Sequence, residues 1–274
     1  MKFSVIIVCL NAGGELKKTV DSVLSQTYGD YEIIVKDGGS EDGSTEFLKD
    51  APKVRLIVKK DRSIYDAMNQ ACRYAVGDYY YFLNCGDYLA DESVLERVAR
   101  FMKGTNADIF YGDLYRRKLA STDVAPDYIS SFVCYRNVPN HQVCFYSKRL
   151  FEKKGYDIRF IVRADYEHFL RCMYKYNAVA VHMPFTVADY MGDGFSESDE
   201  NSRISDREHK IITRKYLGKK CLLYEFIMMI TLQPLRKKLA NSRKFSALYH
   251  RLKGGLYGQG QLSNDAAKRK KGER

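Results

Sequence analysis

Four aspartates stand at places where a carboxylate could bind a ligand or accept a proton: Asp37, Asp61, Asp87 and Asp165. Each follows a predicted strand or opens a predicted helix, where a carboxylate is most often only a turn or capping residue. Asp37 and Asp87, however, follow predicted parallel strands, whose carboxyl ends meet at one edge of a sheet. Two carboxylates at one edge repel each other unless a cation or a polar ligand lies between them. The sequence therefore predicts a site for an ion or a polar ligand at this edge.

The residues before Asp87 support this interpretation. Tyr79 to Leu83 form a short aromatic and apolar run bounded by turn residues, which predicts a buried strand. Gly86 lets the backbone turn or approach a ligand closely. Asp87 could also cap the next helix, but Asp91 directly precedes the amphipathic segment and is the better cap. Asp87 is therefore available to a ligand.

Alternating strands and helices must position these acids. Strands are predicted over residues 3–8, 32–36, 54–58, 79–83 and 108–111, with helices around 16–24, 45–49 and 64–74. This alternation predicts an α/β fold with a mostly parallel sheet. Further on we expect a strand over 141–146, a helix from 165, strands over 178–182 and 185–188, and helices over 203–217 and 222–252. Neither a dinucleotide fingerprint nor a Walker loop occurs, which argues against an NAD enzyme or a P-loop NTPase.

Composition limits the class and the compartment. The chain has 274 residues and a mass of 31.7 kDa, enough for one large domain with a small appendage. Seven cysteines, an odd number without zinc-site spacing, suggest reduced thiols and a cytoplasmic protein. The first residues lead straight into a strand, so we expect no signal peptide. The apolar run over 222–232 is well short of the roughly 20 residues that a membrane-spanning helix needs.

The net charge of +11 is concentrated toward the end of the chain. Basic pairs and clusters lie at 214–215, 219–220, 236–238 and 268–271, around the apolar run. Such a pattern suits binding to an anionic membrane face. The alternatives are a solvated helix with a basic tail, or binding to nucleic acid, for which no recognition motif is present. The sequence therefore predicts a peripheral membrane partner and no nucleic acid.

Several segments together resemble the family 2 inverting glycosyltransferases, which have the GT-A fold. The matching stretches are Phe3 to Asn11, Val23 to Tyr28, Glu32 to Ser44, Ile64 to Ala71, Tyr81 to Asp87 and Ala164 to Tyr166. The resemblance covers roughly residues 2–198 and is closest to the branch of bacterial colanic-acid and capsule polysaccharide transferases. It implies a Rossmann-like, mostly parallel sheet flanked by helices, with a helical extension at the carboxyl end.

The resemblance also implies a division of the chain. A GT-A domain is expected over residues 1–200, with a nucleotide-sugar half over about 1–115 and an acceptor half over about 116–200. A helical, basic, membrane-associating extension is expected over 201–258. Residues 259–274 are expected to form a disordered basic tail.

Individual residues acquire roles from the same resemblance. It implies contacts to the nucleotide sugar from Asn11, Asp37, Asp61, Asn69, Asn84, Cys85 and Gly86. Asp87 matches the last acid of the family's Asp-x-Asp metal motif, and the two acid positions that precede it in the family here hold Asn84 and Gly86. One carboxylate together with donor phosphates still suits Mn²⁺ or Mg²⁺. Asp165 matches the general base, with Glu167 as its rival, and a helix cap is its plainer role. Acceptor or lid roles are implied for His141, Gln142, Phe195, Ser196 and Arg203.

The resemblance thus implies a metal-dependent inverting glycosyltransferase of surface polysaccharide synthesis. It would move a sugar from a nucleotide sugar, with UDP as the expected nucleotide, to an acceptor hydroxyl by a single displacement. The expected acceptor is a growing glycan or a polyprenyl-diphosphate-linked sugar at the inner face of the cell membrane. The alternative is a catalytically silent nucleotide-sugar-binding protein of the same fold, which the reduced acid cluster would suit.

Overall fold

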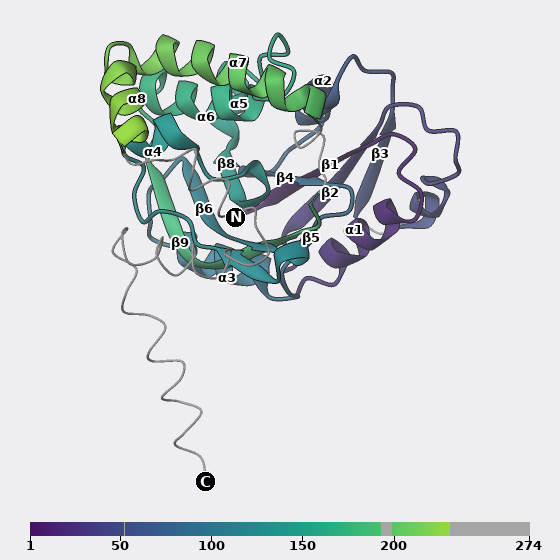
Figure 1. Ribbon diagram of the computed structural model, residues 1–274. Helices are drawn as coiled ribbons and strands as arrows, with labels where there is room; N and C mark the ends of the chain where they lie inside the picture. Colours follow the sequence, from purple (N-terminus) through teal and green to yellow (C-terminus); the bar gives the residue numbers. More distant parts are fainter. Residues whose placement is uncertain (52, 193–198, 231–274) are drawn as a thin grey trace. The chain divides into compact units, whose positions relative to one another are not determined.

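The centre of the structure is a nine-stranded sheet (Figure 1). The computed structural model describes residues 1–51, 53–192 and 199–230, and all statements below concern these. The strand order is β3-β2-β1-β4-β8-β6-β9-β5, and β7 pairs with β6 off this path. The bounds are β1 Phe3–Cys9, β2 Tyr31–Asp37, β3 Val54–Val58, β4 Tyr79–Asn84, β5 Tyr88–Leu89, β6 Ile109–Arg116, β7 Ser121–Asp123, β8 Cys144–Ser147 and β9 Ala180–Tyr190. Only β5, β7 and β8 run against the common direction, so the predicted mostly parallel α/β sheet is confirmed.

Helices cover both faces of this sheet (Figure 1). On one face lie α1 (Glu15–Leu24) and α3 (Val94–Met102). On the other lie α2 (Ile64–Cys72), α5 (Lys148–Lys153), α6 (Ala164–Lys175) and α7 (Asp199–Leu217). The remaining elements are α4 (Ser131–Arg136) and the 3₁₀ turns η1 (Glu46–Asp50), η2 (Arg117–Leu119) and η3 (His141–Val143). Because both faces are covered, the central strands are continuous apolar runs, and every residue of β1 is buried.

The aromatic strand β4 is fixed in the core by its tyrosines. The ring of Tyr81 stacks on Phe145 of β8, with centroids 4.5 Å apart. Burying a phenol costs free energy unless its hydroxyl finds a partner. The three tyrosine hydroxyls donate to backbone carbonyls, those of Ala107, Ala75 and Gln142 in the order of the strand. The end of β4, and with it Asp87, therefore stands on a rigid base.

The structure differs from the sequence-based elements in the second half of the sheet. The strand expected over 141–146 begins only at Cys144, because η3 turns the chain before it. The two strands expected over 178–182 and 185–188 are one strand, β9. Pro184 lies within β9 where the register with β6 is irregular, so its missing N–H interrupts no regular ladder.

The chain divides by its contacts into two units, Met1–Gly218 and Lys219–Arg274. The helix α7 contacts α4 and α6 and belongs to the first unit, although we expected it in an extension beginning at residue 201. The second unit contains α8 (Lys220–Ile230), and the rest of the expected 222–252 helix and the 259–274 tail lie outside the described residues. None of the described helices has the length and apolar character that crossing a membrane requires.

Candidate active site

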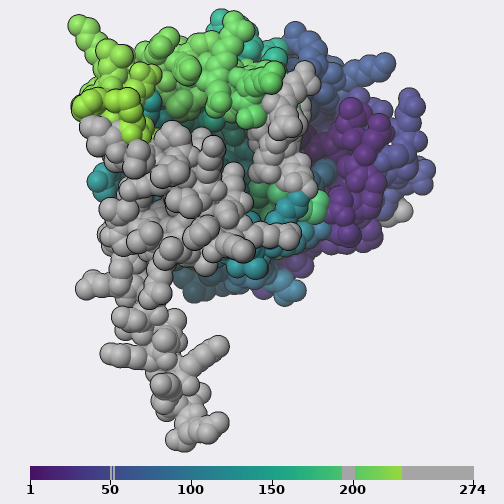
Figure 2. Space-filling view, viewed as in Figure 1, coloured from purple at the N-terminus to yellow at the C-terminus, as the bar shows by residue number. Residues whose placement is uncertain are grey.

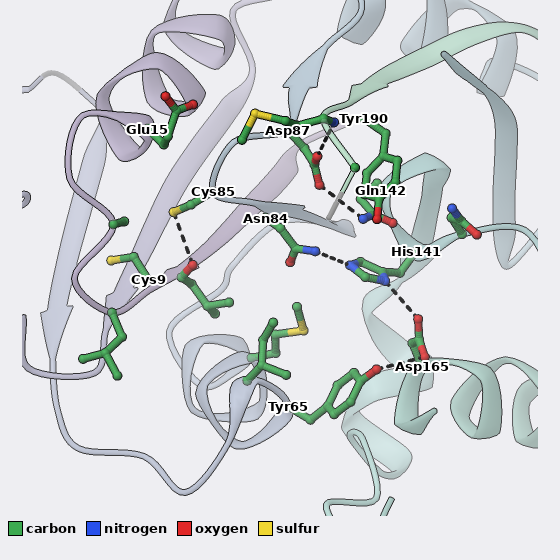
Figure 3. Close-up of a pocket in the computed structure, with 18 of the residues that line it drawn as sticks. Cys9, Glu15, Tyr65, Asn84, Cys85, Asp87, His141, Gln142, Asp165 and Tyr190 are labelled. Atoms are coloured by element: carbon green, nitrogen blue, oxygen red, sulfur yellow. Dashed lines mark hydrogen bonds and ion pairs between the residues drawn. The ribbon is translucent and has the colours of Figure 1, made fainter. Parts of the chain in front are cut away.

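A cavity of about 570 Å³ opens at the carboxyl ends of β1 and β4. Asn84, Cys85 and Asp87 line it from the end of β4 and the turn that follows. His141 and Asp165 line it from η3 and α6 (Figure 3). The cavity therefore brings together the predicted metal ligand and the predicted general base, whose positions in the chain are far apart.

Asp87 is held by donors from two other segments. The turn Asn84 to Asp87 closes with a hydrogen bond of 3.1 Å from the Asp87 N–H to the Asn84 carbonyl. The carboxylate of Asp87 accepts from the Met191 N–H at 3.0 Å and from Gln142 Nε2 at 3.2 Å. Only 4% of the residue is exposed. Burial raises the pKa of Asp87, and the Met191 N–H, Gln142 and the charges of His141 and Arg117 oppose that rise without cancelling it.

The residues around Asp87 fit a divalent ion that a ligand helps to hold. No group of three or more His, Cys, Asp or Glu residues in the described part of the chain could hold a metal alone. The cavity does offer hard oxygen donors, namely the Asp87 carboxylate and Asn84 Oδ1, which is buried and accepts no hydrogen bond from the described residues. Magnesium and manganese are commonly held by one or two protein oxygens together with substrate phosphates.

Asp165, in the first turn of α6, is the centre of a second hydrogen-bond cluster (Figure 3). Its Oδ2 lies 2.9 Å from His141 Nδ1, and its Oδ1 accepts from the Tyr65 hydroxyl at 3.0 Å. Asn84 Nδ2 lies 3.1 Å from the other imidazole nitrogen, Nε2. The ring of His141 thus lies between the Asp165 carboxylate and the Asn84 amide, and a proton on Nδ1 is donated to Asp165. The Tyr166 N–H also donates to Oδ1, at 2.8 Å, so the carboxylate is oriented by three donors, and it remains 26% exposed.

The surroundings of Asp165 favour its ionised form. Burial by itself raises the pKa of this carboxyl, but the hydrogen bond and charge of His141 lower it. The Tyr166 N–H and the Tyr65 hydroxyl act in the same direction, and the net pKa lies below the ordinary value. Asp165 is therefore a carboxylate at neutral pH, with a free lone pair that can accept a proton from a hydroxyl in the cavity.

Glu167, the rival candidate for the base, does not line the cavity. It is fully buried, and its Oε1 accepts from Lys215 Nζ at 2.8 Å and from the Tyr216 hydroxyl at 2.5 Å. Its Oε2 lies 3.0 Å from Arg171 Nη1. Glu167 therefore joins α6 to α7 and is not positioned for chemistry.

Three predicted nucleotide contacts hold the loops beside β2 and do not line the cavity. The Asp37 carboxylate, which is buried, accepts from the Ser40 N–H at 2.9 Å and from its hydroxyl at 2.5 Å. Asn11 Oδ1 accepts from the Glu41 N–H at 3.0 Å. Asp61 Oδ2 accepts from Lys36 Nζ at 2.7 Å. Asp37 thus binds its own loop, and the ion or polar ligand expected between Asp37 and Asp87 stays a prediction.

Asn69 also lies elsewhere. Its amide pairs with both backbone groups of Tyr156, at 2.8 and 2.9 Å, as a peptide group in a sheet would. It lines a second cavity, of about 390 Å³, which shares no lining residue with the site. Asn69 thus has its partner within the protein, and its contact to the nucleotide sugar stays a prediction.

The remaining predicted residues divide as follows. Gly86 does not line the cavity, and its φ of +92° together with the Met191 side chain explains why no Cβ fits there. Arg203 is exposed on α7 and does not line the cavity, and Phe195 and Ser196 lie outside the described residues. His141 and Gln142 do line it, where they hold Asp165 and Asp87.

Sequence reasoning missed Tyr65 and Met191, which orient the two carboxylates. Tyr65 follows the helix cap Ser63, whose hydroxyl accepts from the Asp66 N–H, but nothing in the sequence around it indicates that its own hydroxyl reaches Asp165, 100 residues later. Met191 acts through its backbone N–H, which every residue type except proline has, so its role cannot be predicted from the sequence. The sequence-based predictions also missed Glu15 and Arg116, the other charged residues that line the cavity.

Comparison with known proteins finds a matching family model, related sequences and solved structures of similar fold. The model of the family described as glycosyl transferase family 2 matches residues 4–180. The PGL/p-HBAD biosynthesis glycosyltransferase of Mycobacterium tuberculosis (strain ATCC 25177 / H37Ra) is 34% identical over 195 residues, 69% of this chain and 76% of its own length.

Two solved structures share the fold. S. aureus TarS 1–349 in complex with UDP-GlcNAc has a TM-score of 0.59 at 14% identity, and the match covers 79% of this chain and 72% of that one. The mannosyltransferase PcManGT from Pyrobaculum calidifontis, in complex with GDP-Man and Mn²⁺, has a TM-score of 0.62 at 12% identity, covering 90% and 83%.

Proposed function

Since the chain belongs to glycosyltransferase family 2, we propose that its cavity holds a nucleotide sugar and transfers the sugar to an acceptor hydroxyl with inversion, using Asp165 as general base. The observation that carries the proposal is the pair of oriented carboxylates, Asp87 and Asp165, on one cavity. The bound donors of the two structural neighbours, UDP-GlcNAc and GDP-Man, support a nucleoside diphosphate sugar as the donor class.

Asp165 would act on the acceptor side of the cavity. Its carboxylate takes the proton from the acceptor hydroxyl while that oxygen attacks the anomeric carbon, and the nucleoside diphosphate leaves from the opposite face. A single displacement of this kind inverts the anomeric centre. The His141 N–H and the Tyr65 hydroxyl keep the carboxylate oriented during the transfer, which is the condition for efficient general base catalysis.

Asp87 would act on the donor side. The Asp87 carboxylate and Asn84 Oδ1 would hold Mn²⁺ or Mg²⁺ together with the donor diphosphate. Such an ion, when bound, supplies positive charge to the departing diphosphate. Gln142 and the Met191 N–H fix the carboxylate, so Asp87 needs little rearrangement to bind.

The test is turnover of a panel of UDP-, GDP- and dTDP-sugars with Mn²⁺ or Mg²⁺. We expect Asp165→Asn to lower the rate by about 10²–10⁴-fold while the calorimetric affinity for the nucleotide stays unchanged. Asp87→Ala should remove metal-dependent nucleotide binding. Asp21→Asn, an exposed aspartate on α1, is the matched control and should behave as the native protein.

Two results would count against the proposal. An Asp165→Asn variant as active as the native protein would exclude Asp165 as the base. Native protein that binds a nucleotide sugar tightly but turns over none of the panel, with or without glycan acceptors, would favour the silent binding protein that the reduced acid cluster suggested.

The location of the acceptor belongs to the same proposal. In α8 the side chains of Leu222, Phe226 and Met229 are exposed at helical spacing, and Lys219 and Lys220 stand at the start of the helix. An apolar stripe beside basic residues suits the surface of an anionic membrane, where a polyprenyl-diphosphate-linked acceptor would be found. Flotation with phosphatidylglycerol vesicles, but not with phosphatidylcholine vesicles, is the expected result, and no flotation with either would contradict it.

A further inference from the structure

The helix that carries Asp165 begins without a side-chain cap from its own sequence. Arg163 is the N-cap residue of α6, and its side chain makes no capping hydrogen bond. Glu208 of α7 instead binds the turn that leads into the helix, where its carboxylate accepts from Ile161 N at 2.6 Å, Val162 N at 3.0 Å and Arg163 N at 2.8 Å. A carboxylate is well suited to this place, because the start of a helix carries unpaired donors and a partial positive charge.

Glu208 is connected to Asp165 through the backbone that it binds. Val162 gives its N–H to Glu208 and its carbonyl to the Tyr65 hydroxyl, at 2.8 Å. The same hydroxyl lies 3.0 Å from Asp165 Oδ1. The Arg163 carbonyl accepts the first helical hydrogen bond of α6, from the Glu167 N–H at 2.9 Å. The turn before Asp165 is thus fixed at its N–H groups by α7 and at its carbonyls by α2 and α6.

Further contacts hold α7 in place along α6. Arg163 Nε donates to the Ser205 hydroxyl at 2.8 Å. The ring of His209 stacks on Tyr166, with centroids 5.4 Å apart. In the space-filling view the green side chains of α7 form part of the molecular surface (Figure 2), whereas Glu208 is only 6% exposed. Glu208 therefore lies on the inner face of α7, against the turn.

We propose that Glu208 is a positioning residue for Asp165, so that α7 takes part in catalysis although it does not line the cavity. The inference rests on the proposed role of Asp165 as the base. In Glu208→Gln one of the two accepting oxygens becomes an NH₂ donor that faces the N–H groups of the turn before α6, so this turn and Tyr65 can shift. A displacement of about 1 Å at a catalytic group can lower a rate by about 10²-fold.

The test is Glu208→Gln, compared with Tyr216→Phe, which removes a different contact between α7 and α6. We expect kcat for the nucleotide sugar that the panel identifies to fall about 10- to 100-fold in Glu208→Gln, with the donor KM within about twofold of native. Amide hydrogen exchange over residues 161–166 should become faster. Tyr216→Phe should keep kcat within about twofold of native, even if it lowers the melting temperature as much as Glu208→Gln does.

Two outcomes would overturn the inference. One is a Glu208→Gln protein with native kcat, and the other is an equal loss of kcat in Tyr216→Phe at the same loss of stability. If Glu208→Gln does not fold, Glu208→Asp keeps the charge but shortens its reach, and the same comparison applies. Failure of the proposed function is a separate result, because it would appear as full activity of Asp165→Asn.

Discussion

The ion pair between Lys36 and Asp61 offers a sharp test, because the sequence predicted a nucleotide contact at Asp61 and the structure gives it a partner inside the protein. Lys36 is fully buried in β2, and its Nζ donates to Asp61 Oδ2 at 2.7 Å and to the carbonyls of Asp37 and Lys59 at 3.1 and 2.5 Å. Asp61 is 16% exposed. The perturbation is Asp61→Asn, which leaves the ammonium without its counter-charge.

The magnitude follows from these contacts. At an effective dielectric constant of about 20, two charges 2.7 Å apart attract by roughly 6 kcal/mol, most of which offsets the cost of removing them from water. Breaking a buried pair by removing one partner costs about 3–5 kcal/mol. Lys36 keeps two carbonyl acceptors, so we expect the lower end, about 3 kcal/mol, and a fall in melting temperature of about 6–12 °C.

The assay is urea unfolding at neutral pH of four proteins: native, Asp61→Asn, Lys36→Met and the double variant. Lys36→Met should cost only about 1 kcal/mol, since Asp61 can regain water, and the double variant should be close to it. The coupling energy between the two sites is then about 2–3 kcal/mol. An Asp61→Asn protein that loses less than about 0.5 kcal/mol, or a coupling energy near zero, would refute the reasoning. The stability of the double variant is largely restored, so its affinity for nucleotide tests separately whether Asp61 contacts the nucleotide sugar.

Two further predictions concern other parts of the structure. Gly86→Ala should weaken metal-dependent nucleotide binding in calorimetry, because a Cβ at φ +92° would lie 2.7 Å from Met191 Cε and disturb the N–H that holds Asp87. Gly104→Ala, at φ +82° with open space around it, is the control that should keep binding, and equal binding in both variants would contradict the argument. Burial lowers the pKa of His182, but the hydrogen bonds and charges of Asp113 and Asp127 raise it by a larger amount. The net pKa therefore lies above the ordinary value. Its stabilisation is therefore complete below the unfolded pKa of about 6.5 and is lost as the pH rises through the folded pKa. In urea unfolding His182→Gln should cost more free energy at about pH 5.5 than at about pH 9, and a cost that grows with pH would be the wrong sign.

The sequence was a good guide where function depends on strand ends. The apolar run of β4 and the turn after it predicted where Asp87 stands, and the start of α6 predicted Asp165. Both predictions succeed because periodicity and turn residues are local properties of the chain. The family resemblance added the pairing of the two carboxylates, which no local pattern contains.

Asp61 and Asn69, which the resemblance predicted to contact the nucleotide sugar, both have partners within the protein. Each side chain is used by a partner distant in sequence, Lys36 for the first and the Tyr156 backbone for the second. The sequence does not distinguish a polar residue that binds a ligand from one that binds another part of the chain. Glu208 illustrates the converse, since it lies 43 residues after Asp165 and nothing near it in the sequence indicates that it binds the turn before α6.

The short turn η3 has a consequence for how such an enzyme can be altered. His141 and Gln142 are neighbours in the chain, yet one holds Asp165, the proposed base on the acceptor side, and the other holds Asp87, the proposed metal ligand on the donor side. Hybrid enzymes that join the donor half of one transferase to the acceptor half of another must therefore import this turn in register with both partners. Changes in acceptor preference should accumulate around the turn and seldom within it, because a shift of its backbone disturbs both halves of the reaction at once.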